Sequence, residues 1–149
     1  MDSLTPEEKQ LAIVMHIFFY VFLIAGFFFM LFPGLTFDGL NLASQKLFPS
    51  LPLLPASPEK YWLVLAFSFM MTITALSYMA KQDIATRKGY IIPILVSKLS
   101  TTVAGLLVFL FYFRAFAHLA NSLVDFSIFL IILTLYRKAK ASEPKGKHA

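Results

Sequence analysis

Cysteine is absent from this chain of 149 residues. Disulfide bonds, thiolate metal sites, Cys-x-x-Cys redox motifs and cysteine nucleophiles are therefore excluded. The patterns GxSxG, HExxH, Walker A and GxGxxG, which mark hydrolases, zinc proteases and nucleotide-binding proteins, are also missing. We expect no catalytic residue, no metal ion and no cofactor. Whether the protein is an enzyme stays open, with the balance towards a non-enzymatic role.

Charged residues are scarce and apolar residues abundant. Asp, Glu, Lys and Arg make up 14% of the chain, against about 25% in soluble proteins. Hydrophobic residues make up 58% and include 17 Phe, which a small soluble domain has too little interior to hide. The net charge is +5, but the basic residues gather at the ends of apolar runs, so no nucleic-acid partner is expected. The composition predicts a protein solvated by the lipid bilayer.

Four apolar stretches reach the length of about 20 residues that crosses about 30 Å of hydrocarbon. Thr5-Pro6-Glu7-Glu8 has the form of a capped helix start, Pro33-Gly34 ends the first helix, and Ser57-Pro58-Glu59-Lys60 repeats the start signal. The predicted fold class is all-α: a membrane-spanning four-helix up-down bundle in one domain, residues 1–138. Its helices are expected at about 6–33, 58–81, 90–113 and 115–137. Residues 139–149 are expected to form a basic flexible tail.

The longest connection, residues 34–57, joins the first two predicted spans as a Pro-rich outer loop. Pro49, Pro52 and Pro55 fix the backbone φ angle and should keep its second half extended. Its first half, residues 38–48, has the pattern of a short helix that lies on the outer surface.

The direction of the spans follows from the placement of Lys and Arg, which accumulate on the cytoplasmic side. With both termini on one side, nine of the 13 basic residues fall on that side. Lys46, Lys60 and Arg114 fall on the other side, and Lys98 lies within a span. The sequence therefore predicts a multi-pass protein of the cell inner (plasma) membrane with both termini cytoplasmic.

Two ionisable residues interrupt the predicted spans: Lys98 in the third and Asp125 in the fourth. At about 1.5 Å per residue, Lys98 lies ~13 Å and Asp125 ~18 Å from the inner ends of their helices. Each unpaired charge would cost about 2.5 to 3.5 kcal/mol, so we predict a contact between them in the inner half of the bundle. The pair either fixes the register of two helices or serves as a proton-relay or ligand-binding pair.

Polar residues also recur along the fourth span, where His118, Asn121, Ser122 and Asp125 follow the spacing of one helix face. This stripe indicates either ordinary packing through small and polar side chains or a polar cavity that opens outward past Asn121 and His118. His16 is either an interfacial residue or a third member of the Lys98 and Asp125 cluster. Since His16 and His118 lie at different depths, they are not expected to ligate one haem. The candidates for ligand binding or ion pairing are Lys98, Asp125, His16, Asn121 and His118.

Residues 61–138, with the segment LSYMAKQD at 76–83, Lys98 and Asp125, resemble the broad group of small bacterial four-helix membrane proteins that includes DoxX-like families. The resemblance implies a four-helix bundle and an inner-membrane location more than any activity. It implies no catalytic residue, and the Pro-rich outer loop departs from it.

Two hypotheses for function follow. In the first, the protein is a non-catalytic subunit or partner of a larger membrane assembly, with the lipid bilayer and other membrane subunits, or further copies of itself, as its partners. In the second, it binds or carries a quinone-like or lipid ligand in a polar-lined bundle centre. An oxidoreductase or transferase is disfavoured by the missing motifs, and a transporter would require an oligomer.

Overall fold

The computed structural model describes residues 4–55 and 61–142, apart from the side chain of Tyr61. Its elements are α1 (Pro6–Leu31), α2 (Pro33–Leu47), α3 (Tyr61–Gln82), the 3-10 turn η1 (Lys88–Tyr90), α4 (Ile91–Phe111) and α5 (Phe116–Ala141). Four of these helices, α1, α3, α4 and α5, are long and apolar enough to cross a membrane. The predicted all-α, four-helix bundle is therefore confirmed.

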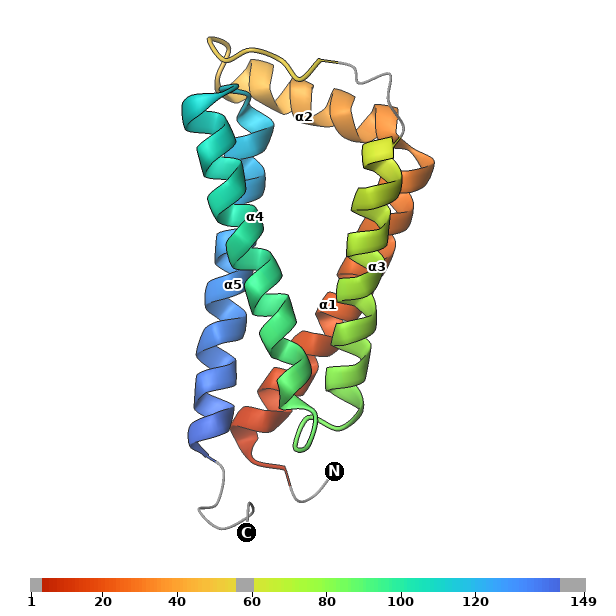
Figure 1. Ribbon diagram of the computed structural model, residues 1–149, viewed down its shortest axis with the longest axis vertical. Coiled ribbons are helices and arrows are strands. Elements are labelled where there is room, and N and C mark those ends of the chain that lie inside the picture. The colour runs from red at the N-terminus through yellow and green to blue at the C-terminus, as the bar shows by residue number, and fades with distance from the viewer. Residues whose placement is uncertain (1–3, 56–60, 143–149) are drawn as a thin grey trace.

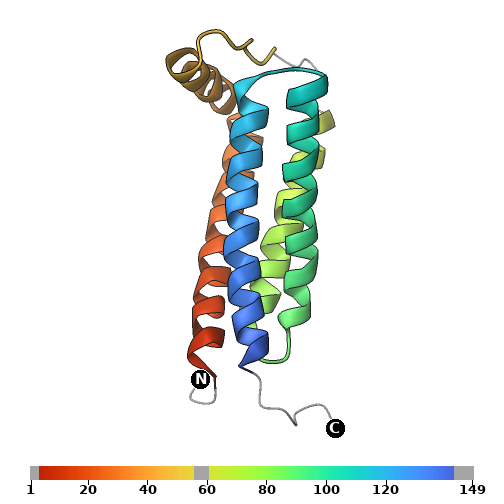
Figure 2. The same ribbon diagram turned by 90° about the vertical axis from the view of Figure 1, so that its left-hand side faces the viewer.

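The four long helices form two pairs: α1 packs along α3, and α4 packs along α5. Figure 1 shows that the pairs meet at the end of the bundle where α1 begins and α5 ends, and that they diverge towards the opposite end. We call the first end the terminal end. The opposite end, which α2 crosses from one pair to the other, is the α2 end. In Figure 2, turned by 90°, α4 and α5 run side by side along the length of the bundle.

Helix α1 begins as the sequence predicts. The Glu8 amide donates to Thr5 Oγ1 over 3.2 Å, and the Thr5 amide donates to Glu8 Oε2 over 3.0 Å. These two hydrogen bonds form a capping box, which satisfies two amide groups that a helix start leaves free. The Thr5 hydroxyl also lies 3.0 Å from that of Ser142, so the start of α1 is linked to the end of α5.

The connection after α1 differs most from the prediction. Pro33 does end α1, but it is also the first residue of α2, which is longer than the predicted 38–48 segment. A proline suits the first turn of a helix because its missing amide proton would be unpaired there in any case. Beyond α2, the side chain of Asn41 donates to the Leu54 carbonyl and accepts from the Leu54 amide, over 3.1 and 2.8 Å. The extended, proline-containing segment is thereby held against α2.

Aromatic contacts hold α2 across the gap between the two pairs. Phe37 lies 6.0 Å from Phe29 of α1, and Phe48 lies 5.4 Å from Phe116 of α5, measured between ring centroids. Since one contact reaches each pair, α2 ties the diverging ends together.

Two other helix ends were predicted less well. Helix α4 stops at Phe111, two residues before the predicted end, and residues 112–115 form the connection to α5. Helix α5 continues beyond the predicted end at 137 through Ala141. Ala, Lys and Arg favour helices, and Lys138 and Lys140 lie where cations stabilise a helix C-terminus. The predicted start of the second span at 58 and the tail residues 143–149 lie outside the described residues.

The turn between α3 and η1 is closed by Asp83, whose Oδ2 accepts from Thr86 Oγ1 over 2.5 Å. This side-chain hydrogen bond lowers the pKa of the Asp83 carboxyl. The Arg87 amide donates to the Asp83 carbonyl over 2.9 Å and completes the turn.

The hydrophobic core lies in the half of the bundle nearer the terminal end, where all four long helices meet. Its buried members are Leu11, Met15, Phe22, Ile73, Ala80, Ile84, Ile91, Ile94, Leu95, Ile132 and Ala139. Nearer the α2 end, close packing is found within each pair instead. A Cβ atom built on Gly26 of α1 would lie 2.6 Å from Met71 Cε, and one on Gly105 of α4 would lie 2.3 Å from Ser122 Oγ. Glycine therefore allows each pair to approach closely.

Candidate functional site: a buried lysine and aspartate pair

The centre of the bundle holds the two charges that the sequence singled out. Lys98 Nζ on α4 donates to Asp125 Oδ1 on α5 over 2.8 Å. Lys98 is 7% exposed and Asp125 6%, so the pair is shielded from the surroundings of the bundle. The predicted contact is therefore present. It joins α4 to α5 because the two helices run antiparallel and bring positions 98 and 125 to the same level.

Each charged group has a further partner. Thr101, one turn after Lys98, donates its hydroxyl proton to Asp125 Oδ2. Its oxygen also lies 3.1 Å from the Ser97 carbonyl, but one hydroxyl carries one proton, and the bond to a carboxylate is the stronger of the two. Lys98 Nζ lies 4.5 Å from the ring centroid of Phe22 on α1, within the range of a cation–π interaction. Three helices therefore enclose the pair.

The pair lies close to the middle of the apolar spans. Asp125 follows Arg114 by 11 residues and precedes Arg137 by 12, or about 16 and 18 Å along a helix. At this depth the bilayer contains no water to solvate a charge, so the partners of the two groups must come from protein. The arrangement is electrically neutral, and both carboxylate oxygens are engaged.

A second ion pair, which the sequence analysis missed, lies at the terminal end. Lys88 Nζ of η1 donates to Glu8 Oε1 of α1 over 2.6 Å, and both residues are buried. Glu8 thus serves the capping box with one oxygen and the ion pair with the other. The capping motif identified Glu8 in the sequence, whereas Lys88 was used only as one of the basic residues that indicate the direction of the spans. Nothing in the sequence indicated that α1 passes beside the start of α4.

His16 does not join the central pair. Met15 and Phe22 turn into the core, and because successive residues are 100° apart, His16 comes to the exposed side of α1. There its Nδ1 lies 3.0 Å from Lys81 Nζ of α3. Its ring meets that of Tyr20 edge-on, with 5.1 Å between centroids.

The polar stripe on α5 divides into a buried and an outer part. Ser122 and Asp125 face α4 and are buried, whereas Asn121 is exposed. His118 is half-buried, and its ring lies edge-on to Phe113 with 6.4 Å between centroids. The Ser122 hydroxyl donates to the His118 carbonyl over 2.8 Å. The buried part thus packs two helices, as one of the two interpretations expected.

No family model, curated protein or solved structure matches the chain. The resemblance to DoxX-like proteins therefore stays a prediction. Within residues 4–55 and 61–142, no three His, Asp or Glu side chains come together in a way that could hold a metal ion.

Proposed function

We propose that this chain is a small integral membrane protein that acts as a non-catalytic subunit or partner of a larger membrane assembly. The observation that carries the proposal is the side chain of Asn121. It is exposed on α5, within a helix of spanning length, and no side-chain hydrogen bond to it occurs among residues 4–55 and 61–142. An amide facing hydrocarbon without a partner is unfavourable, since it loses the hydrogen bonds that it makes in water.

The surroundings of Asn121 suit a neighbouring helix. Asn121 lies about 7.5 Å along the helix from the start of α5, inside the apolar region. Ala117 and Val124 lie on the same side of α5 at the i−4 and i+3 positions, and Val124 is 57% exposed. A small residue such as Ala117 lets a second helix approach closely, and an asparagine can then bond across the contact. A partner helix from another membrane chain, or from a second copy, would satisfy the amide.

The charged groups favour a non-catalytic role for the bundle. Lys98 and Asp125 neutralise each other, and Thr101 occupies the second carboxylate oxygen. A structural pair that fixes the register of α4 and α5 accounts for both contacts.

We also propose that the terminal end faces the cytoplasm and that the membrane is the cell inner membrane. Of the described basic residues, those near the terminal end are Lys9, Lys81, Arg87, Lys88, Arg137, Lys138 and Lys140. Near the α2 end the described basic residues are Lys46 and Arg114. The positive-inside rule associates the end with more Lys and Arg with the cytoplasmic side.

Native mass spectrometry of the protein, extracted in mild detergent from its own membrane, tests the subunit proposal. We expect a complex of fixed stoichiometry that contains further membrane chains, and we expect Asn121→Leu to dissociate it. Ser127→Ala is the matched control, because Ser127 is also exposed on α5 but donates to the Leu123 carbonyl of its own helix over 2.8 Å. A wild-type protein that is purely monomeric, or a complex that survives Asn121→Leu, would contradict the proposal.

The alternative, a carrier of a quinone-like or lipid ligand in the bundle centre, has less support. It requires Lys98, Asp125 and Asn121 to line one cavity, but the first two are bonded to each other and the third is exposed. Two hollows in the described part of the chain are lined by other residues, most of them on α1.

A further inference from the structure

A hollow of about 730 Å³ lies between α1 and α3 near the terminal end. Its polar lining consists of Lys9, His16, Tyr78, Lys81 and Gln82. Two of these side chains are cationic, and no Asp or Glu among residues 4–55 and 61–142 lines the hollow. A negatively charged group would therefore meet attraction from two ammonium groups.

Lys81 is held in place within this hollow. Its Nζ lies 4.3 Å from the ring centroid of Phe19, 5.2 Å from that of Tyr78 and 5.6 Å from that of Tyr20. The rings and His16 Nδ1 position the ammonium group but carry no formal negative charge, in contrast to the partners of Lys88 and Lys98. In the described part of the chain no carboxylate forms an ion pair with Lys81. Its charge is thus preorganised and not neutralised by an anion.

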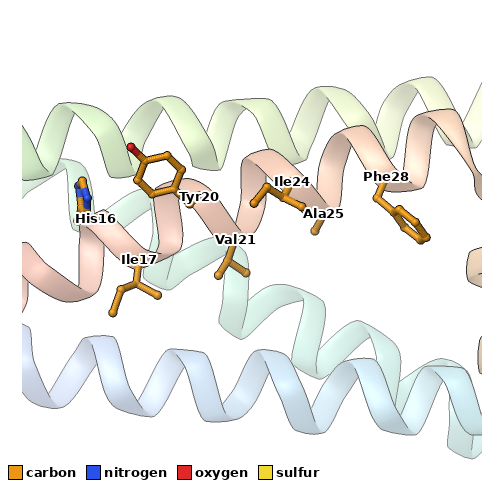
Figure 3. A pocket seen from close by; sticks show the side chains of 7 residues that line it. All are labelled: His16, Ile17, Tyr20, Val21, Ile24, Ala25 and Phe28. Carbon is orange, nitrogen blue, oxygen red and sulfur yellow. The ribbon is translucent and has the colours of Figure 1, made fainter.

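A second hollow, of about 580 Å³, continues along α1 towards the α2 end. Figure 3 shows the side chains of its lining, which run along one side of α1 between α3 and α5. Beyond His16 and Tyr20 the lining is entirely apolar: Ile17, Val21, Ile24, Ala25 and Phe28. His16 lines both hollows, so the two adjoin at this side chain. We call the two adjoining hollows together the α1 groove.

The α1 groove has a cationic part and an apolar part, which correspond to the anionic headgroup and the acyl chains of a lipid molecule. From His16 its apolar part extends about 18 Å along the helix to Phe28, three residues before the end of α1. Its cationic part lies near the end of α3, with Lys81 next to the last residue of that helix. An acyl chain and an anionic headgroup of one leaflet would therefore each meet matching surface.

We propose that the α1 groove binds one anionic phospholipid from the leaflet at the terminal end. The phosphate lies between Lys9 and Lys81, with His16 and Tyr78 as hydrogen-bonding neighbours, and one acyl chain lies along the apolar lining that begins at Ile17. The site is separate from Asn121, which is on α5, so it does not depend on the proposed role as a subunit.

The test is a lipid titration of the full-length protein, followed by native mass spectrometry, with phosphatidylglycerol and phosphatidylcholine of identical acyl chains. We expect one phosphatidylglycerol to bind in preference to phosphatidylcholine. The double variant Lys9→Gln with Lys81→Gln should weaken phosphatidylglycerol binding by about twenty-five-fold, at about fivefold per lysine. Lys140→Gln is the control, since Lys140 is an exposed lysine at the same end and lines neither hollow.

The two parts of the ligand are tested separately. Ala25→Phe fills the apolar part without altering any charge and should also displace the lipid. Soluble glycerol phosphate, which has the headgroup chemistry but no acyl chain, should not compete. Circular dichroism verifies that each variant is folded; should the double variant fail, Lys9→Gln replaces it, because Lys9 is exposed.

Four results would overturn the proposal. The first is equal binding of the two lipids, and the second is an equal loss in Lys140→Gln, which would indicate unspecific attraction. The third is displacement by glycerol phosphate, which would assign the groove to a free anion. The fourth is a protein dimer that Ala25→Phe dissociates, which would assign the groove to a second copy. None of these results depends on Asn121, so failure here is distinct from failure of the subunit proposal.

Discussion

Lys98 and Asp125 show why the effect of a buried charge depends on what remains after a substitution. Removing either residue alone leaves its partner as an unpaired charge in the bundle centre, whereas replacing both with apolar residues leaves an apolar contact. We expect Lys98→Met or Asp125→Leu to destabilise the protein by about 3 to 5 kcal/mol, and the double variant to differ from wild type by about 1 kcal/mol or less. Unfolding in mixed detergent micelles, followed by circular dichroism, measures each value.

The exchange Lys98→Asp with Asp125→Lys separates a structural role from a functional one. If the pair only fixes the register, the exchanged protein should fold and retain its partner complex. A protein that folds but loses the complex would show that the positions of the charges matter beyond stability. A double Met and Leu variant as unstable as the single variants would contradict the account of the pair.

Glu8 combines two tasks that can be separated by substitution. Gln at this position can still accept the hydrogen bond of the capping box but cannot pair as an anion with Lys88, whereas Ala can do neither. We therefore expect Glu8→Ala to be less stable than Glu8→Gln by about 1 kcal/mol, the usual contribution of one hydrogen bond. Glu7→Gln, in the same first turn, controls for the loss of a charge near the helix start. Equal stability of the two Glu8 variants would contradict the capping role.

At the residue scale, the sequence predicted contacts that chemistry makes obligatory. Two opposite charges in adjacent antiparallel spans leave little choice of partner, so the contact of Lys98 with Asp125 could be foreseen. The partner of His16 could not, because it depends on how far α1 is rotated about its own axis. The same holds for Asn121, whose exposure differs from that of the adjacent Ser122.

At the scale of the helices, the closest approach of α4 and α5 depends on Gly105. A Cβ atom there would lie 2.3 Å from Ser122 Oγ and 3.3 Å from the His118 carbonyl oxygen. We expect Gly105→Ala to destabilise the protein by about 1 to 3 kcal/mol through overpacking. Adding Ser122→Ala removes the nearer atom and should recover part of the loss.

Gly39→Ala is the matched control, because a Cβ atom on this exposed residue of α2 would have nothing within 4 Å. Alanine favours a helix over glycine by up to about 1 kcal/mol, so this variant should be as stable as wild type or more so. The measurement is again unfolding in mixed micelles. If Gly105→Ala proved as harmless as Gly39→Ala, the helices would not be in the contact described.

Helix boundaries were predicted where a local signal decides them. The capping box of Thr5 and Glu8 and the proline after Phe32 are such signals. Pro33 was interpreted only as the end of the first helix, but it is also the first residue of α2. Proline cannot continue a helix that precedes it, and it fits well in the first turn of a helix that follows. The continuation of α5 through Ala141 depends on helix-favouring residues that also suit a flexible tail.

For the whole molecule, the decisive measurement is the side of the membrane on which each connection lies. The natural chain has no cysteine, so single cysteines can be labelled without background. Gln45 on α2 and Arg87 before η1 are both exposed and lie at opposite ends of the bundle. In intact cells, an impermeant maleimide should label Gln45→Cys and should label Arg87→Cys only after permeabilisation. The reverse pattern would contradict the proposed cytoplasmic location of the terminal end.

The number of spans and the bundle class followed from composition, because helices of this length and apolarity are dictated by the thickness of a bilayer. The division into two diverging pairs did not follow. It depends on Gly26 and Gly105, which permit close packing within each pair, and on α2, which spans the gap at the far end. Small residues in the spans indicate contact sites, but their spacing does not rank one helix contact above another.

The separation of Lys98 and Asp125 along the chain has a consequence for synthesis. The ribosome adds Asp125 27 residues after Lys98, which at about 5 to 20 residues per second takes about one to five seconds. During that interval Lys98 has no carboxylate partner and would enter the lipid as an unpaired charge. Helix α4 is therefore expected to wait at the insertion machinery until α5 has emerged. The two helices would then leave for the bilayer together, as a hairpin that carries no net charge at its centre.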